Sequence, residues 1–417
     1  MTTSDQASLL FLAHRIPYPP NKGDKIRSFH LLRRMAEDYD VFLGTFVDDP
    51  TDWSGVAVLK DFCKEVHAVG LDPFWSRVHS LRSFAAREAL SLGYYRNRDM
   101  RQWVDKVISS GSISKGFAFS GPMAQYLDDT RLEIRVVDFC DVDSEKWRQY
   151  ATTRNWPLSW VYRREASRLA EFECDVAGCA DFSLFATTEE ADLFRRVANR
   201  FDNKTVVVRN GVDTEFFDPE VRLPDPYPEQ GLRVVFTGEM DYWPNVQAVA
   251  WFVDNVLPIV RNRRPEAKFF IVGRNPTDAV IALGGQDGVV VTGAVNDIRS
   301  WIVHGHVVVA PLQIARGIQN KVLEAMAMAK PVVASEEAVT GLPAGVESVL
   351  SIANSEAEFS ASILSLLEDG IERRQFGSAA RKFALESCAW QRGMNVAARL
   401  LDSEEQAVDP ALGANQQ

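Results

Sequence analysis

The stretch that decides the fold runs from residue 314 to residue 335 and reads IARGIQNKVLEAMAMAKPVVAS. Its centre has apolar residues at helical spacing, and it ends in a proline followed by a short apolar run. Directly before it lies VVVAPL, residues 307–312, which has the composition of a buried strand. A strand, a polar loop, an amphipathic helix and a second strand in this order predict an α/β domain with a parallel sheet.

The beginning of this predicted helix carries two cations, Arg316 and Lys321, followed by a carboxylate, Glu324. The first turn of a helix has unpaired N–H groups and about half a positive charge. The two cations at this end predict an anion site that suits phosphate, and Glu324 suits hydroxyl groups such as those of a ribose. A solvated helix start in which Lys321 and Glu324 form a weak pair explains the same residues. The residues alone leave both interpretations open.

The rest of the chain repeats the alternation of strands and helices. Strand-like runs in the first half are SLLFLAH, VFLGTFV, GFAFS, IRVVDFCD, DFSLFATT and KTVVVRN, and those in the second half are LRVVFTG, AKFFIVG, GVVVTG, HVVVAPL and PVVAS. Between the halves, NGVDTEFFDPEVRLPDPYPEQG contains four prolines and predicts a linker. We therefore expect an N-terminal domain at 1–215, a linker at 216–230, a C-terminal domain at 231–403 and a flexible tail at 404–417.

Composition excludes several broad classes of protein. The 417 residues are 46% hydrophobic and 25% charged, as in globular proteins, and the net charge of −11 argues against general nucleic-acid binding. No apolar run is long enough for a signal peptide or a membrane span, so we expect a cytoplasmic protein or one attached to the inner face of the membrane. The cysteines form no metal-binding spacing and indicate reduced, buried thiols: Cys63, Cys140, Cys174, Cys179 and Cys388.

Common catalytic motifs are missing from the sequence. There is no GxGxxG, no GxxxxGK[ST], no HExxH and no GxSxG. Their absence disfavours hydride transfer, P-loop ATP hydrolysis, zinc proteolysis and hydrolysis at a nucleophile elbow. Two doubly wound domains are expected to bind their ligand at the carboxyl ends of their strands.

Several segments taken together resemble family 4 glycosyltransferases of the GT-B fold. The segments KVLEAMAMAKPVVAS with TGLPAG, VVRNGVDTEFFDP, FFIVGRNP, VVVTGAVNDIRSWIVHGHVVVAPL and SCAWQRG occur in the order of that family. HRIPYPPNKGDKIRSFHLLRRMA and VVDFCDVDSEKWRQYA are similar to a branch associated with exopolysaccharide loci and the PEP-CTERM (exosortase) system. The resemblance covers nearly the whole chain. It implies two facing Rossmann-like doubly wound domains with an interdomain cleft.

The resemblance also implies roles for individual residues of the C-terminal domain. Glu324 matches the second glutamate of a spaced pair that holds the donor ribose. Lys321 and the backbone near Gly317 would hold the donor diphosphate, and Gly238, at the end of the first strand of this domain, would open toward the phosphates. The first glutamate of the pair is replaced here by Arg316, and GEMDYWPN lacks the usual phosphate-binding cations. We infer that Arg316 supplies the missing charge.

On the N-terminal side, the resemblance implies that Gly23 belongs to a glycine loop that approaches the donor and that Arg27 follows it on the next helix. Asp138, Asp141 and Asp143 follow a predicted strand, and we favour Asp141 as the group that orients or deprotonates the acceptor hydroxyl. The alternative for Asp141 is a turn carboxylate that caps the helix starting near Ser144. A metal site at DVD, residues 141–143, is disfavoured.

Residues 73–106 combine seven Arg or Lys with three Asp or Glu, and aromatic residues lie between them. This composition fits helices on an anionic membrane that carries a lipid-linked acceptor, and it also fits solvated helix faces with aromatics in the core. Both interpretations stay open.

The sequence thus predicts a retaining hexosyltransferase that moves a sugar from a nucleotide-sugar donor to a glycan or polyprenyl-linked acceptor in exopolysaccharide biosynthesis. The nucleotide sugar is a substrate, and no cofactor, no metal and no nucleic acid are expected. Two alternatives remain. One is a nucleotide-sugar epimerase on the same fold, and the other is a non-catalytic GT-B scaffold subunit, for which the glutamate lost at Arg316 would be the sign.

Overall fold

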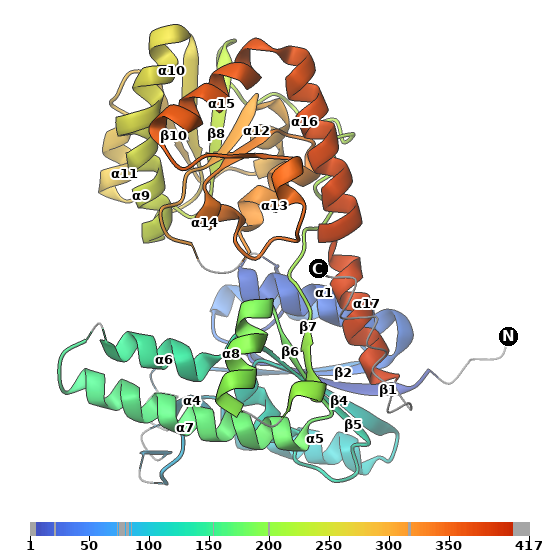
Figure 1. The fold of residues 1–417 in the computed structure, drawn as a ribbon. Helices are drawn as coiled ribbons and strands as arrows, with labels where there is room; N and C mark the ends of the chain where they lie inside the picture. Colours follow the sequence, from blue (N-terminus) through green and yellow to red (C-terminus); the bar gives the residue numbers. More distant parts are fainter. Residues whose placement is uncertain are drawn as a thin grey trace, which may run out of the picture. The chain divides into compact units, whose positions relative to one another are not determined.

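The computed structural model describes residues 6–402, apart from 21, 73, 75–79, 81–82, 85, 153, 199–200 and 316–317. The described residues divide into two compact units. Unit 1 comprises 6–209 and 393–402, and unit 2 comprises 210–392. Each unit contains a parallel sheet with helices around it (Figure 1).

The described part of unit 1 contains a seven-stranded parallel sheet with the order β3-β2-β1-β4-β5-β6-β7. Its strands are rich in aliphatic and aromatic residues, and β1 is buried along almost its whole length, as expected for a strand covered on both faces. The strands are β1 (Ser8–Ala13), β2 (Asp40–Val47), β3 (Glu65–Gly70), β4 (Ile113–Phe119), β5 (Ile134–Cys140), β6 (Phe182–Phe185) and β7 (Thr205–Val207).

The helices of unit 1 have amphipathic sequences whose apolar faces are buried. α1 buries Leu31, Leu32 and Met35, and α5 is capped by Asn97, whose side chain accepts a hydrogen bond from the N–H of Met100. The helices are α1 (Gly23–Asp38), α2 (Gly55–Lys60), α4 (Leu90–Tyr94), α5 (Arg98–Ser109), α6 (Asp143–Thr152), α7 (Leu158–Cys179), α8 (Thr188–Ala198) and most of α17 (Trp390–Leu401).

Unit 2 contains a six-stranded parallel sheet in its described residues, with the order β10-β9-β8-β11-β12-β13. The strands are β8 (Leu232–Thr237), β9 (Ala267–Val272), β10 (Val289–Gly293), β11 (Val307–Ala310), β12 (Val332–Ala334) and β13 (Ser351–Ile352). Its helices are α9 (Trp243–Trp251), α10 (Leu257–Arg263), α11 (Asp278–Leu283), α12 (Ile298–His304), α13 (Asn320–Ala327), α14 (Glu336–Val339), α15 (Glu356–Glu368) and α16 (Gly370–Phe383).

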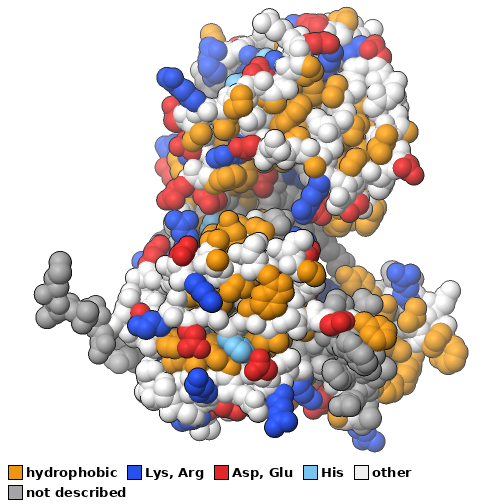
Figure 2. All heavy atoms as spheres, turned by 180° about the vertical axis from the view of Figure 1, so that it is seen from behind, with side chains coloured by type: hydrophobic (Ala, Val, Ile, Leu, Met, Phe, Trp, Pro, Cys, Tyr) orange, Lys and Arg blue, Asp and Glu red, His pale blue; other side chains and the backbone are white. Residues whose placement is uncertain are grey.

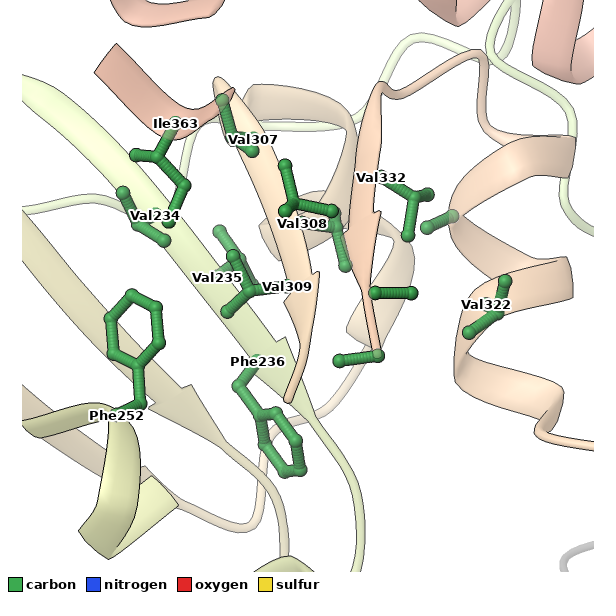
Figure 3. Packing of buried hydrophobic residues seen from close by; sticks show 14 of the residues in the cluster. Val234, Val235, Phe236, Phe252, Val307, Val308, Val309, Val322, Val332 and Ile363 are labelled. Carbon is green, nitrogen blue, oxygen red and sulfur yellow. The ribbon is translucent and has the colours of Figure 1, made fainter. Parts of the chain in front are cut away.

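Valine side chains on the central strands form one part of the core of unit 2. Figure 3 shows valines of β8, β11 and β12 packed beside one another, with Val322 contributed by α13 and Ile363 by α15. These side chains are fully or almost fully buried. β-branched residues fit the surface of a sheet, so the valine-rich runs explain why these segments form strands.

Both sheets have the strand order of a doubly wound fold, in which the order reverses beside the first strand of the unit. The reversal lies between β1 and β4 in unit 1 and between β8 and β11 in unit 2. The prediction of two Rossmann-like α/β sheets is therefore confirmed. In such sheets, ligands bind at the carboxyl ends of the strands next to the reversal.

The unit boundaries differ from the predicted domain limits of 1–215 and 231–403. The proline-containing segment expected at 216–230 belongs to unit 2, where Tyr227 is buried and donates a hydrogen bond to the carbonyl of Trp301. Residues 393–402 belong to unit 1, where Asn395 accepts from Arg34 and Asp402 pairs with Lys115. The predicted tail, 404–417, lies outside the described residues.

No helix in the described ranges has the length and apolar character needed to cross a membrane.

Glycines end three neighbouring strands of unit 2 and allow the backbones to approach closely. The N–H of Gly238 donates to the carbonyl of Val272 at 3.1 Å, and the N–H of Gly273 donates to the carbonyl of Gly293 at 3.3 Å. A Cβ added to Gly273 would lie 1.7 Å from the carbonyl oxygen of Gly238. The strand ends of β8 and β9 can therefore keep this spacing only with glycine at position 273.

We expect Gly273→Ala to destabilise unit 2 by about 3 kcal/mol or more, because the added methyl group meets a backbone atom that no side-chain rotation can move. The measurement is the free energy of unfolding from denaturant titration. Gly285→Ala is the matched control, because its Cβ meets only an ordinary contact at 3.4 Å. Equal stability of both variants and the parent would contradict the close approach.

Candidate functional site

Lys321 is the central side chain of the candidate site in unit 2. It lies in the first turn of α13, which follows β11, one of the two strands that flank the order reversal of the sheet. Its ammonium lies 4.4 Å from the centre of the Phe236 ring and donates a hydrogen bond to the side-chain oxygen of Asn245. Phe236 is on β8, the other flanking strand, so the ammonium lies at the place where this fold binds ligands.

The charge of Lys321 has no close partner of opposite sign. In the described part of the chain, no carboxylate lies within 4.0 Å of its ammonium. An aromatic face and a neutral amide stabilise a cation less than a carboxylate does. Because an anion would supply the missing charge, this arrangement favours an anionic ligand.

Glu324 lies three residues after Lys321 on the same helix and is partly buried. Among the described residues, no hydrogen-bond donor to its carboxylate is found, so both oxygens keep their capacity to accept hydrogen bonds from a ligand. A partly buried carboxylate beside a cation site fits hydroxyl groups that donate to it.

Burial shifts both ionisable groups toward neutral pH. It lowers the pKa of Lys321 to about 7 and raises the pKa of Glu324 to about 7. The attraction between the two opposite charges opposes both shifts but does not cancel them. Both groups are therefore sensitive to any further charge that binds beside them.

Gly238 and Asn245 complete the described surroundings of the ammonium. Gly238 ends β8, and a Cβ added there would lie 2.7 Å from the side-chain nitrogen of Asn245 and 3.4 Å from the Lys321 ammonium. Asn245 is buried and donates to the carbonyl of Glu239 at 2.8 Å, which fixes its oxygen toward Lys321. Gly238 thus lies next to the cation, as expected from its position at the strand end.

Asn245 and Phe236 were not predicted as site residues. The stretch GEMDYWPN was noted only for the cations that it lacks, yet its asparagine is the residue that holds the lysine. The sequence feature that could have indicated Asn245 is a polar residue directly after a proline at the start of a helix. This helix follows the glycine at the end of the first strand of the domain. Arg316 and Gly317, by contrast, lie outside the described residues, so their predicted roles stay predictions.

In unit 1, Gly23 is the first residue of α1, and a Cβ added there would meet no atom within 4 Å. Next to it, Asp24 accepts a hydrogen bond from Arg15 at 2.6 Å and lies 3.4 Å from His14. His14 and Arg15 directly follow β1, so this polar cluster lies at the carboxyl end of that strand. The sequence reasoning missed the cluster, and the open space at Gly23 leaves its predicted role untested.

Arg27 was expected to contact the donor, whereas its contacts in the structure are with residues of unit 1. It is 2% exposed, and its guanidinium binds both carboxylate oxygens of Asp138, at 2.8 and 3.1 Å. It also donates to the carbonyl of Val208 at 2.6 Å. With these contacts made inside unit 1, Arg27 joins α1, β5 and the segment after β7, and its charge is already compensated.

Asp141 lies after the end of β5, where Cys140 has the left-handed backbone angle φ of 64°. Its carboxylate pairs with the ammonium of Lys146 at 2.7 Å, and Asp143 pairs with the same ammonium at 3.2 Å. Burial lowers the pKa of Lys146, but the two carboxylates outweigh burial and hold that pKa above its usual value. Asp141 remains partly exposed, and its proposed role toward an acceptor stays a prediction.

The structure thus brings three of the predicted residues together, Gly238, Lys321 and Glu324, and all three belong to unit 2. Gly23, Arg27 and Asp141 belong to unit 1. In the described ranges, no three His, Cys, Asp or Glu side chains gather as a metal site would require. Several residues of the basic segment 73–106 lie outside the described residues, so that segment is not assigned a face.

Comparisons with known proteins found a family match within unit 2. Residues 231–369, which make up most of unit 2, match the family model described as Glycosyl transferases group 1. The comparison with curated proteins gave no match in sequence.

Solved structures of similar fold include HepE from Anabaena in complex with UDP, with 15% identity and a TM-score of 0.63, covering 95% of this chain and 100% of that chain. A glycosyltransferase from Rickettsia africae has 10% identity and a TM-score of 0.65, covering 96% and 100%. WaaG, a glycosyltransferase involved in lipopolysaccharide biosynthesis, has 14% identity and a TM-score of 0.62, covering 95% and 100%. The chain therefore has the GT-B type of fold, and together with the family match this supports a transferase enzyme.

We expect Arg27→Met to lower the free energy of unfolding by about 3–5 kcal/mol, because it leaves the carboxylate of Asp138 buried without its partner. The affinity of the folded variant for nucleotide sugars should stay within twofold of the parent. Denaturant titration and calorimetric binding measure the two effects. Arg33→Met, at an exposed position on the same helix, is the control for stability. A stable variant with weakened binding would show that Arg27 contacts the ligand after all.

Proposed function

We propose that the protein is a retaining glycosyltransferase of family 4 that transfers a sugar from a nucleotide-sugar donor. The observation that carries this proposal is the partly buried ammonium of Lys321, which contacts Phe236 and Asn245 and has no carboxylate within 4.0 Å among the described residues. A diphosphate is the ligand that this arrangement suits best, because it brings the missing negative charge. The family match over 231–369 supports the same conclusion.

A uridine nucleotide is the first donor to test. Three solved structures of similar fold are HepE in complex with UDP, with UDP and glucose, and with UDP-glucose. In the protein described here, Glu324 would accept hydrogen bonds from the ribose hydroxyls of such a donor, and the absence of a side chain at Gly238 would let the diphosphate approach Lys321. Arg316 and the backbone of Gly317 are proposed as further diphosphate contacts.

The proposed reaction breaks the bond between the anomeric carbon of the sugar and the diphosphate oxygen, and it forms a bond from the same carbon to an acceptor hydroxyl oxygen. The electron pair of the broken bond stays on the diphosphate, whose growing charge the Lys321 ammonium stabilises. Asp141 is proposed to orient the acceptor hydroxyl and receive its proton. The anomeric configuration is proposed to be retained, as the resemblance to family 4 implies.

The acceptor is proposed to be a glycan or a polyprenyl-linked sugar of exopolysaccharide biosynthesis, and the site of action is proposed to be the cytoplasm and the inner face of the membrane. No cofactor and no metal are proposed. An epimerase and a non-catalytic scaffold remain the alternatives. An epimerase would release no nucleotide when acceptor is added, and a scaffold would bind donor without turning it over.

We expect Lys321→Ala to reduce the rate of nucleotide release from UDP-glucose or the preferred donor by about a hundredfold or more, because a positioned charge at the leaving group is removed. Glu324→Gln should mainly weaken donor binding. Lys330→Ala is the matched control, since burial also lowers the pKa of Lys330, to about 8, and the residue lies after α13 rather than in its first turn. Donor turnover unchanged in Lys321→Ala would contradict the proposed role.

Donor binding is also expected to take up protons near neutral pH. A bound diphosphate raises the pKa of Lys321 above its value of about 7, because its negative charge favours the protonated ammonium. Affinity should therefore fall as pH rises from 7 to 9, by at most about tenfold per pH unit for each proton taken up.

Calorimetric titration with a UDP-sugar in two buffers of different ionisation enthalpy measures this uptake. A sugar diphosphate ester is the suitable probe, because it has no ionisable proton of its own near pH 7. Asn245→Asp should abolish most of the uptake by keeping Lys321 protonated before the donor arrives, and Lys330→Ala should leave it unchanged. Proton release on binding, or no change in affinity between pH 7 and 9, would contradict the assignment of the donor to Lys321.

A further inference from the structure

The helices α6 and α7 form a hairpin in unit 1 whose connecting end has an unusual composition. Residues 146–164 contain five Lys or Arg and five Trp or Tyr but no Asp or Glu, within a chain whose net charge is −11. Figure 1 shows the two helices side by side, with their connection at the end that projects away from the sheet of unit 1. The segment therefore combines positive charge and aromatic residues at one projecting end.

Large apolar side chains at this end are exposed to solvent. Trp156 is 80% exposed, Tyr150 53%, Leu158 50% and Trp160 48%. Figure 2 shows hydrophobic and basic side chains together on the projecting part of unit 1. Scattered exposed hydrophobic residues are normal, but several large ones within eleven residues of the chain indicate an interaction surface.

Side chains between the two helices hold the hairpin together. Its helices are joined by inner side chains, among them Trp147 and Tyr162, whose ring centres are 5.0 Å apart. The buried carboxylate of Glu173 on α7 accepts hydrogen bonds from the N–H and the hydroxyl of Ser144 on α6. Tyr150 packs against Trp147 and Trp160 against Phe84, while Trp156, Leu158 and Trp160 keep large areas exposed to solvent.

Two of the five basic side chains at this end, Arg154 and Arg163, have no carboxylate partner among the described residues. Among the described residues, no carboxylate pairs with Arg154, and Arg163 donates only to the hydroxyl of Ser159, at 3.4 Å. The other three cations are engaged: Lys146 pairs with Asp141 and Asp143, Arg148 pairs with Glu145, and Arg164 donates to backbone carbonyls and lies over the ring of Phe84. The partner that this end fits is therefore anionic as well as apolar.

We propose that the end of the α6–α7 hairpin docks on the surface of an anionic lipid bilayer. Trp156, Leu158 and Trp160 would enter the boundary between headgroups and acyl chains, and Arg154 and Arg163 would contact the lipid phosphates. Tryptophan and arginine are suited to this boundary, where apolar and charged layers meet within a short distance. A projecting end that exposes apolar residues and unpaired cations close together in the chain fits a flat, fluid surface better than it fits a protein groove.

This docking deepens the proposed function, on which its purpose rests, because a lipid-linked acceptor would be reached at the same surface. Binding to a bilayer needs neither donor nor acceptor. Its test therefore fails or succeeds independently of the transferase assignment.

The experiment is co-sedimentation of the full chain with vesicles of phosphatidylcholine alone and of phosphatidylcholine mixed with phosphatidylglycerol. We expect binding to the mixed vesicles and at least tenfold weaker binding to the neutral ones. Trp156→Ser combined with Trp160→Ser should weaken binding to the mixed vesicles at least tenfold. Arg154→Gln combined with Arg163→Gln should remove most of the preference for phosphatidylglycerol and most of the salt dependence.

Trp53→Ser is the matched control, because Trp53 is 46% exposed in the same unit but lies outside the hairpin. Near-parental vesicle binding by the double tryptophan variant, or no binding by the parent chain, would overturn the proposal. The proposal would also be overturned if that variant kept its vesicle binding but no longer formed a dimer or no longer bound a soluble oligosaccharide. Far-ultraviolet circular dichroism verifies that each variant is folded before the comparison.

Discussion

A lysine ammonium without an opposing carboxylate is the constraint on which the proposed chemistry of this protein depends. Lys321 is held in place by an aromatic ring and an amide, both of which are neutral. A nearby carboxylate would stabilise the protein but would also compensate the charge that a ligand must meet. The surrounding structure serves to keep this cation partly buried and uncompensated: the glycines at the ends of β8 and β9 bring the strand ends together, and Asn245 fixes the direction of the ammonium.

Unit 1 shows the opposite solution at its own sheet. Arg27 is buried, and Asp138 binds it with both carboxylate oxygens. The pair joins a helix to the fifth strand, and the guanidinium has no charge left to offer a ligand. The first six strands have the same order in both units, yet the buried cation is paired with a carboxylate in one and has no carboxylate within 4.0 Å among the described residues in the other. The same fold can therefore carry different tasks according to how each cation is paired.

The sequence predicts the parts of this structure that local patterns determine. Valine-rich runs followed by amphipathic stretches placed the strands of unit 2, and the position of Lys321 and Glu324 at the start of a helix followed from the same pattern. Contacts between distant residues were beyond such reasoning. Asn245 lies 76 positions before Lys321, and Asp138 lies 111 positions after Arg27, so neither pairing leaves a local sign in the sequence.

The unit boundary differs from the linker predicted from the prolines at 219–228 for a related reason. Prolines and polar residues are typical of linkers, but the segment also contains Tyr227, whose ring packs against Phe270 and Trp301. One buried aromatic residue is enough to attach the segment to unit 2. Packing of this kind depends on which side chains lie opposite, and the residues opposite come from β9 and α12.

The lowered pKa of Lys321 in the free protein has a consequence for selectivity. Burial lowers the pKa of Lys321 to about 7, so the full positive charge is stabilised only when an anion lies beside it. A neutral sugar or a glycan without phosphate supplies no such charge and gains nothing from the lysine. A diphosphate gains a complete cation together with the hydrogen bonds that Glu324 can accept. The site would thus distinguish an activated sugar from the many unactivated sugars of a cell through protonation, in addition to shape.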